Sequence, residues 1–485
     1  HEAKNNKVII NAGNLDILYE ESSQFDELGM QQLNISIIRD YFSEFIIEGK
    51  HSGGIVIDVK PERVIYLNDS FQLQSLPWDD SYKWAKQKID INKLGPSPQN
   101  FYDILRVGDL IHLTKIDENY FLDQVPDAEV AFISSDPSSG AIKTYVGGID
   151  FSKSNFDRVK QSYPQAGSSF KPFIYASAFA NGYSASDKIN DAPIIFEDSN
   201  LESSWRPENY TGKFYGPIRL REALVQSVNL VSIKLLREMG ISKTQNYLSR
   251  FGFPVSRLAP DLSLALGSSS FSPAEMLRAY NILVNSEDPK DLFFIERIED
   301  RNKNTIFEHS KIEDKKQNID GFPWFQTQLT EKIQPFYLLP PITNVIKQPI
   351  DPRVTFITKD ILREALSRGS NGRKTKVLNR SDIAGKTGTT NDAISTWFSG
   401  FHNDLATTVW VGTDDFSSLG NNEFGSTIAL PVWVDFMQIA LPSLPEEEWK
   451  IPKGLSYVRV DRETGKPTEE TSDNAYFELF LDKAN

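Results

Sequence analysis

The sequence contains no cysteine and only five histidines. Without cysteine the chain has no thiol nucleophile, and it cannot form disulfide bonds, cysteine zinc sites or iron–sulfur clusters. The histidines are scattered and show none of the short spacings of metal-binding helices. We therefore expect no metal, no cofactor and no serine–histidine–aspartate triad, and we assign the histidines to packing or to the surface. They are His1, His51, His112, His309 and His402.

Basic residues are outnumbered, since 52 Lys and Arg face 66 Asp and Glu, which gives a formal net charge of −14. Nucleic-acid binding needs clustered Lys and Arg, and the sequence has no such cluster, so no nucleic-acid partner is expected. The sequence also lacks the run of about 20 apolar residues that crosses a bilayer. We expect the chain as printed to be soluble, and its start at His1 favours a processed product or an excised fragment.

Apolar residues are plentiful enough for a substantial core. Of the 485 residues, 39% are hydrophobic and 12% are aromatic. This length suits two or three domains of roughly 100 to 200 residues each. Between residues 50 and 125, short segments alternate apolar and polar residues and are separated by turn residues, which predicts a small β domain. The segments are 55–59, 63–67 and 110–114.

Beyond residue 128 the pattern predicts an α/β (α+β) domain. Two strands joined by a tight turn come first, helices follow, and three strands come last. One helix opens with Ser272-Pro273-Ala274-Glu275, a capping box with proline at the first helical position. Strands at both ends of the domain predict one antiparallel five-stranded sheet with helices on both faces. The predicted strands are 130–134, 141–146, 382–389, 395–401 and 405–412, and the other helices are 168–180 and 220–239, the latter ended by Gly240.

Three further segments have their own predictions. Residues 35–47 could form a helix, and residues 310–350, rich in charge, proline and aromatics, predict an irregular insertion. Ser472-Asp473-Asn474 lies in an acidic tail and is predicted to be a turn.

Three short motifs occur in order in the second domain. Ser168 and Lys171 stand three residues apart on a predicted helix, so the amine can reach the hydroxyl. Ser168 would lie at the helix N-terminus, where unpaired N–H groups favour developing negative charge. A lysine with an ordinary pKa, about 10.4, is a poor base at neutral pH, so burial or a second cation must lower the pKa of Lys171. Lys386 could be that second cation.

The other two motifs are Ser227-Val228-Asn229 and Lys386-Thr387-Gly388. Ser227 is a candidate proton relay, and Asn229 offers an amide to a peptide-like substrate. The segment 386–389 offers a cation and hydroxyls to a carboxylate. Each motif alone also has a structural interpretation, in which Ser168 caps a helix, its lysine is solvated and 386–388 ends a strand. The ordered set of three favours catalysis.

Together the motifs resemble the active-site signature of the penicillin-recognising serine enzymes. The surrounding sequence resembles the transpeptidase portion of class A penicillin-binding proteins, of the 1a type. Gln165-Ala166-Gly167 and the segment 395–398 depart from the family pattern but leave the candidate catalytic side chains in place. The segments that carry the resemblance are 136–151, 167–173, 205–210, 215–217, 265–268, 382–392 and 408–412.

The resemblance implies a transpeptidase domain with the fold shared by penicillin-binding transpeptidases and serine β-lactamases. It implies anchoring at the periplasmic face of the inner membrane, through an N-terminal segment and beside a glycosyltransferase domain that this sequence does not show. Peptidoglycan stem peptides and β-lactam antibiotics would bind, and an outer-membrane lipoprotein activator would dock on the OB-like domain. The implied segments are a linker or partial interdomain region (1–48), the OB-like domain (49–126), the transpeptidase domain (127–445) and a C-terminal extension packing on it (446–485).

The implied reaction is D,D-transpeptidation. Ser168 would attack the carbonyl of the penultimate D-Ala, with Lys171 as the general base, and Ser227 and Lys386 would pass a proton to the departing D-Ala. The backbone N–H groups of Ser168 and Thr389 would form the oxyanion hole. Asn229, Thr387, Gly388 and Thr389 would bind substrate, and an amine from a neighbouring stem would take the acyl group.

Two alternatives stay open. In a D,D-carboxypeptidase or a β-lactamase-like hydrolase, water would replace the acceptor amine, although no glutamate-bearing loop indicates a base for that water. A non-catalytic penicillin sensor would need none of these side chains, and all of them are intact.

Overall fold

The computed structural model describes residues 51–70, 72–151, 154–194, 205–309, 339, 349–369, 372–469 and 474–482. The chain divides into two compact units. The first takes the described residues up to Asp127 together with Asp150–Asn155, and the second takes Ala128–Ile149 and the described residues from Phe156 onward. The predicted helix at 35–47, most of the predicted insertion at 310–350, and Ser472 and Asp473 lie outside the described residues.

The first unit is an antiparallel sheet with strand order β3-β2-β1-β6-β7. The three strands predicted from alternation fall within β1, β2 and β6, so this prediction is confirmed. In the core, one face of the sheet packs against an aromatic cluster of Trp78, Tyr82 and Phe101. The elements are β1 (His51–Lys60), β2 (Arg63–Asn68), β3 (Leu73–Pro77), η1 (Asp80–Trp84), β4 (Lys88–Asp90), β5 (Lys93–Leu94), η2 (Phe101–Asp103), β6 (Leu110–Ile116) and β7 (Asn119–Asp123).

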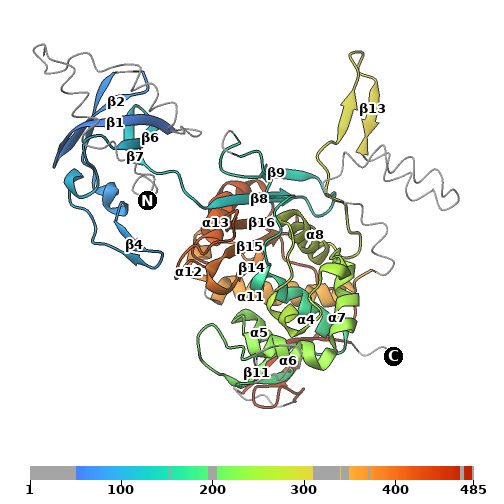
Figure 1. Cartoon of the computed structure of the whole chain (residues 1–485). Coiled ribbons are helices and arrows are strands. Elements are labelled where there is room, and N and C mark those ends of the chain that lie inside the picture. Colours follow the sequence, from blue (N-terminus) through green and yellow to red (C-terminus); the bar gives the residue numbers. More distant parts are fainter. Residues whose placement is uncertain are drawn as a thin grey trace, which may run out of the picture. The chain divides into compact units, whose positions relative to one another are not determined.

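The second unit is built on a five-stranded antiparallel sheet with order β14-β15-β16-β8-β9 (Figure 1). Two strands come from before the helices and three from after them, as the sequence predicts. The central strands β15 and β16 are buried along their whole length, because helices cover both faces. The strands are β8 (Glu129–Ser135), β9 (Ile142–Val146), β14 (Ala384–Thr389), β15 (Ser395–His402) and β16 (Leu405–Gly412).

Alternation along the strands divides the core into two layers. On one face Trp397 and Trp410 pack with α4 (Lys171–Ala180), α8 (Pro273–Val284) and α11 (Pro352–Arg368). On the other face Phe398 and Val409 pack with α13 (Ala429–Ala440). Because successive side chains of a strand point to opposite faces, both layers draw on the same strands.

The predicted helix over 220–239 is wrong in one respect, because the chain breaks it in two. α5 (Leu220–Val225) ends before Ser227, which has a left-handed φ of 56°, and α6 (Asn229–Met239) starts afterwards. The predicted helix at 168–180 likewise begins as the 3₁₀ turn η3 (Gly167–Phe170) before α4. Further helical elements are α7 (Ile241–Leu248), η4 (Ser249–Phe251), η5 (Val255–Arg257), η6 (Leu262–Leu266), α12 (Gly372–Thr375), η9 (Lys376–Leu378), η10 (Asn391–Ala393) and η11 (Leu441–Ser443).

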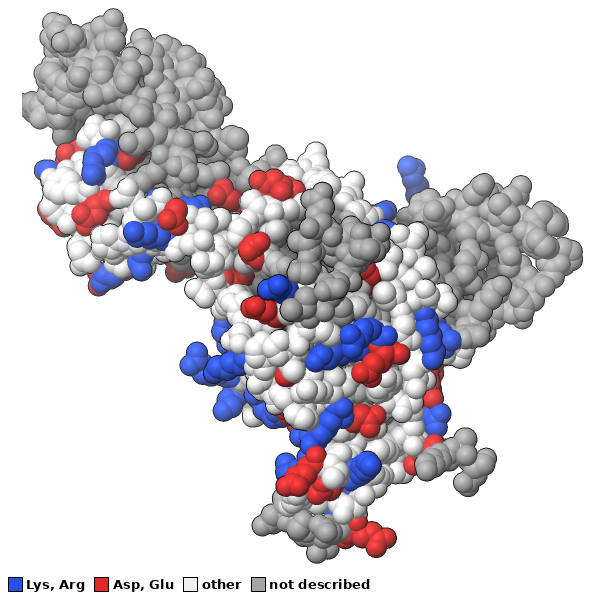
Figure 2. Space-filling view, turned by 60° about the horizontal axis from the view of Figure 1, so that its bottom comes forward, with Lys and Arg blue, Asp and Glu red and all other residues white. Residues whose placement is uncertain are grey.

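The described part of this unit also has three two-stranded antiparallel sheets: β10 (Lys188–Asp191) with β11 (Gly216–Arg219), β12 (Arg297–Glu299) with β13 (Thr305–Glu308), and the C-terminal hairpin of β17 (Leu455–Asp461) with β18 (Ala475–Leu481). On the face of the molecule shown in Figure 2, basic and acidic side chains are interspersed over the described surface.

The predicted capping box at the start of α8 is confirmed. Glu275 N donates to Ser272 Oγ at 3.3 Å, and Ser272 N donates to Glu275 Oε2 at 3.0 Å. Ser272 is fully buried, so water cannot replace the lost acceptor.

We expect Ser272→Ala to lower the free energy of unfolding by about 0.5–2 kcal/mol, the usual cost of losing an N-cap. Thermal melts followed by tryptophan fluorescence measure the loss. Ser256→Ala in η5, at an exposed serine, is the control and should melt with the wild type. An unchanged melting temperature for Ser272→Ala would contradict the capping role.

Candidate active site

Ser168 is half-buried in a turn that the backbone holds tightly. Ala166 N donates to Ser269 O at 3.1 Å, and Gly167 N donates to Gly267 O at 2.9 Å. Gly167 has a left-handed φ of 54°, and a Cβ added there would lie 2.8 Å from Thr389 O. Only glycine fits, because the position combines a left-handed conformation with a backbone contact.

Strand β14 approaches the turn at Ser168 equally closely at Gly388. A Cβ added at Gly388 of β14 would lie 2.8 Å from Ala166 O and 2.9 Å from Ser169 Cβ. The Lys-Thr-Gly strand therefore runs against the nucleophile turn backbone to backbone. The two departures from the family pattern preserve this packing: Ala166 is fully buried, and Trp397 Nε1 donates to Gln165 O at 2.8 Å.

Ser227 lies in the break between α5 and α6. Ser227 N donates to Leu224 O at 3.1 Å, which closes the turn after α5. The first amides of α6 are satisfied by a side chain from a distant loop, because Asn209 Oδ1 accepts from Asn229 N at 3.0 Å and from Leu230 N at 3.2 Å. A helix cannot run through these amides, which explains why the predicted single helix is divided.

Two lysines converge on the hydroxyl of Ser227. Lys171 Nζ lies 3.3 Å from Ser227 Oγ and also donates to Ser227 O at 2.6 Å and to Asn229 Oδ1 at 2.7 Å. Lys386 Nζ donates to Ser227 Oγ at 3.0 Å and to Thr387 O at 2.9 Å. One serine oxygen thus lies between two amines that come from different elements, α4 and β14.

Both amines are buried, and the acceptors that hold them are neutral oxygens. Burial, reinforced by the nearby Lys386 cation, holds the pKa of Lys171 well below its usual range. Burial lowers the pKa of Lys386 to about 7. Desolvation disfavours the charged form of an amine, so at neutral pH these lysines can accept a proton that an exposed lysine could not.

The structure brings the predicted residues together, although not every predicted contact is present. Within the described part of the chain, Ser168 Oγ makes no hydrogen bond, and Lys171 donates to Ser227 and Asn229 instead. The side-chain amide of Asn229 is occupied at both ends, because its Nδ2 donates to Glu208 O at 2.9 Å. The catalytic and binding roles assigned to these residues stay predictions.

The remaining predicted binding residues line β14. Thr387 and Thr389 are half-buried at this edge strand, with Gly388 buried between them. Thr389 Oγ1 accepts a hydrogen bond from Gly425 N at 3.0 Å. The backbone of Thr389 lies beside Gly167, so the two N–H groups predicted to form an oxyanion hole come from neighbouring segments.

Sequence reasoning assigned no role to the residues that support this arrangement. Asn209 is buried and also donates from Nδ2 to both carboxylate oxygens of Asp191 at 2.9 and 2.8 Å. Tyr280 OH donates to Ser169 O at 2.8 Å from α8. Asn209 lies within segment 205–210, which resembles the family, and this resemblance was the sequence signal that could have indicated its role. No sequence signal indicated a role for Tyr280 or Gly425.

Among the described residues, no group of three His, Asp or Glu side chains lies close enough together to hold a metal ion. The described helices include none with the length and apolar character needed to cross a membrane.

With the fold and the site established, comparisons with known proteins identify the class. The family described as penicillin binding protein transpeptidase domain matches residues 130–437, and the one described as penicillin-binding protein OB-like domain matches residues 26–128. The chain belongs to the penicillin-binding protein transpeptidase family, and the resemblance inferred from the sequence is confirmed.

Two relatives and one solved structure share a name. The chain is 36% identical to penicillin-binding protein 1A of Pseudomonas aeruginosa, covering 91% of this chain and 56% of that protein, and 32% identical to the protein of that name in Escherichia coli, covering 80% and 51%. It resembles the crystal structure of penicillin-binding protein 1A from Haemophilus influenzae with a TM-score of 0.75 and 27% identity, covering 96% of this chain and 68% of that one. The chain spans about half the length of the curated relatives it matches.

The buried lysine predicts a pH dependence of stability. The pKa of Lys386 is about 7 in the folded chain, against about 10.4 for an ordinary lysine. Between these values the unfolded chain binds more protons, so the stability of the wild type rises with pH through this window. Below it, the folded chain carries the full cost of the buried charge.

We therefore expect Lys386→Met to be more stable than the wild type near pH 6, with a gain that shrinks as the pH approaches 10. Thermal melts at one-unit intervals measure this difference. Lys376→Met in η9 changes a solvent-exposed lysine and should show a difference that does not vary with pH. A constant offset for Lys386→Met would show that its amine does not titrate in this window.

Proposed function

We propose that this chain is a peptidoglycan D,D-transpeptidase that cross-links stem peptides through a serine acyl-enzyme and that β-lactams acylate at the same serine. The observation that carries the proposal is the pair of buried lysines on Ser227 Oγ, next to the turn that presents Ser168. Such an arrangement supplies unprotonated amines and a relay hydroxyl beside a nucleophile, which general-base acyl transfer needs.

In the first step Ser168 Oγ bonds to the carbonyl carbon of the penultimate D-Ala while its proton passes to Lys171. Burial lowers the pKa of Lys171, so that its neutral form is available to accept this proton. The carbonyl oxygen becomes an oxyanion and accepts hydrogen bonds from the backbone N–H groups of Ser168 and Thr389. Preorganised donors of this kind typically contribute about 3–4 kcal/mol each to transition-state stabilisation.

In the second step the C–N bond to the terminal D-Ala breaks and the departing amine takes a proton. Ser227 Oγ can deliver it, because this hydroxyl bonds to Lys386 and lies 3.3 Å from Lys171. Thr387 and Thr389 would hold the terminal carboxylate at β14. Asn229 holds Lys171 in the free protein, so its role would include placing that amine as well as binding substrate.

An acceptor amine from a second stem then attacks the ester carbon, its proton returns through the same groups, and Ser168 is released. If water attacked instead, the chain would act as a D,D-carboxypeptidase or a β-lactamase-like hydrolase. A sensor without catalysis would not need two lysines buried at a cost in stability.

The wider setting is proposed on the same family grounds. The proposed domain limits are 1–48, 49–126, 127–445 and 446–485, and the proposed site of action of the full-length protein is the periplasmic face of the inner membrane. An outer-membrane lipoprotein activator docking on the OB-like domain stays a prediction.

Labelling with a fluorescent penicillin tests the proposal directly. The wild type should form one long-lived covalent adduct per chain, and Ser168→Ala should form none, because Ser169, the other serine of this turn, is fully buried and donates its hydroxyl to Ala166 O. Ser177→Ala is the matched control, since this serine lies on α4, is fully buried and makes no side-chain hydrogen bond to the described residues. Equal labelling of Ser168→Ala would exclude the proposed nucleophile, and rapid release of the label would favour the hydrolase.

A further inference from the structure

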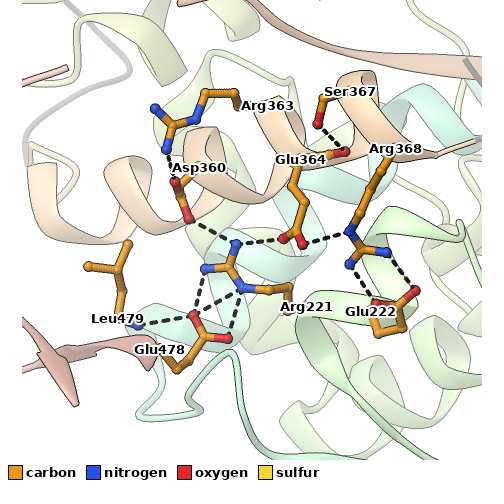
Figure 3. Close-up of polar contacts among 9 residues, drawn as sticks. All are labelled: Arg221, Glu222, Asp360, Arg363, Glu364, Ser367, Arg368, Glu478 and Leu479. Atoms are coloured by element: carbon orange, nitrogen blue, oxygen red, sulfur yellow. Dashed lines mark hydrogen bonds and ion pairs between the residues drawn. The ribbon is translucent and has the colours of Figure 1, made fainter. Parts of the chain in front are cut away.

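A buried ion network lies away from the lysine pair and centres on Arg221 of α5 (Figure 3). Its guanidinium binds Glu478 from Nε at 2.8 and 3.0 Å, Asp360 at 2.8 Å and Glu364 at 2.9 Å. Glu478 is completely buried on β18, while the other two carboxylates lie one turn apart on α11. One arginine thus ties three elements together.

Neighbouring charges extend the network. Arg368 of α11 bonds to Glu222 at 2.6 Å and to Glu364 at 2.7 Å, and Arg363 bonds to Asp360 at 2.5 Å. Two successive residues of α5, Arg221 and Glu222, are therefore held to the same face of α11 (Figure 3). Breaking a buried pair by removing one partner leaves a charge uncompensated, so the network resists displacement.

The elements joined by this network carry the lysine–serine cluster. α5 has only six residues and leads directly into the turn at Ser227, whose left-handed conformation is costly for a non-glycine residue. α11 packs against β14, which carries Lys386, and against α4, which begins at Lys171. A shift of α5 along α11 would therefore move Ser227 Oγ relative to both amines.

The hairpin β17–β18 contacts the region of α5 directly and reaches α11 through Arg221. Toward α5, Tyr476 stacks under the guanidinium of Arg219 at 4.1 Å. Lys188 of β10 donates to Arg462 O at 2.8 Å in the connection that follows β17. Glu478 reaches Arg221, and through it α11. The hairpin lies beyond residue 437, where the match to the transpeptidase family ends.

We propose that the C-terminal hairpin, acting through Glu478 and Arg221, is a positioning element that holds the Ser227 turn in register with Lys171 and Lys386. This inference rests on the proposed function. Arg221 and Glu478 do not contact these groups and act through the placement of α5. A displacement of about 1 Å at a reacting group can cost about a hundredfold in rate, so small movements of this helix would be measurable.

The test uses the full chain and a fluorescent penicillin over a range of concentrations, so that the limiting acylation rate and the half-saturating concentration are obtained separately. We expect Arg221→Met and Glu478→Gln to lower the limiting rate by about ten- to a hundredfold. The half-saturating concentration should change little and labelling should still reach one per chain. Arg221→Lys keeps the charge and should recover part of the rate.

Arg158→Met is the matched control. Arg158 is as deeply buried as the lysines and pairs with Glu129 at 3.3 Å and Asp414 at 2.6 Å, away from α5 and α11. It should lower the melting temperature and leave the limiting rate unchanged.

Wild-type limiting rates in both Arg221→Met and Glu478→Gln would overturn the inference, and so would an equal loss in Arg158→Met. If Arg221→Met does not fold, the milder Glu478→Gln decides. Labelling of Ser168→Ala would instead overturn the proposed function, which keeps the two failures distinct.

Discussion

Two lysine side chains buried around a single serine hydroxyl are the constraint on which the rest of this unit depends. Removing an amine from water disfavours its charged form, and among the residues that the structure describes no carboxylate bonds to either lysine to offset the cost. Lys171 and Lys386 are held by hydroxyl, amide and carbonyl oxygens, which can accept from a neutral amine as well as from a cation. The surrounding core must therefore supply the stability that this cluster consumes.

That core places the cluster by bringing four separate elements to one point. The nucleophile turn and the Lys-Thr-Gly strand touch through backbone atoms, which requires glycine at 167 and 388. The Ser227 turn is held from a distant loop by Asn209. Short contacts of this kind transmit small displacements, because packed interiors have little free space in which to absorb them.

Arg221, in the same unit, is a buried cation that carboxylates compensate. Its buried charge is surrounded by three carboxylates, and these neighbours raise its pKa further above the usual range, against the effect of burial. Within the described part of the chain the two lysines are held by neutral oxygens and can exchange protons, whereas Arg221 stays charged. A pair of lysines that can change charge and an arginine that stays charged thus lie within one unit.

The sequence by itself determined the class of protein, the five-stranded sheet with helices on both faces, three strands of the first unit and the capping box at Ser272. Alternation, capping and motif order are local signals, and they need no knowledge of distant contacts. Only the tertiary structure decided that residues 220–239 form two helices, because the side chain that caps the second one comes from Asn209. The same holds for the Arg221 network and for the hydrogen bonds of Lys171, which go to Ser227 and Asn229. These depend on which segments meet in space, and spacing along the chain carries no record of that.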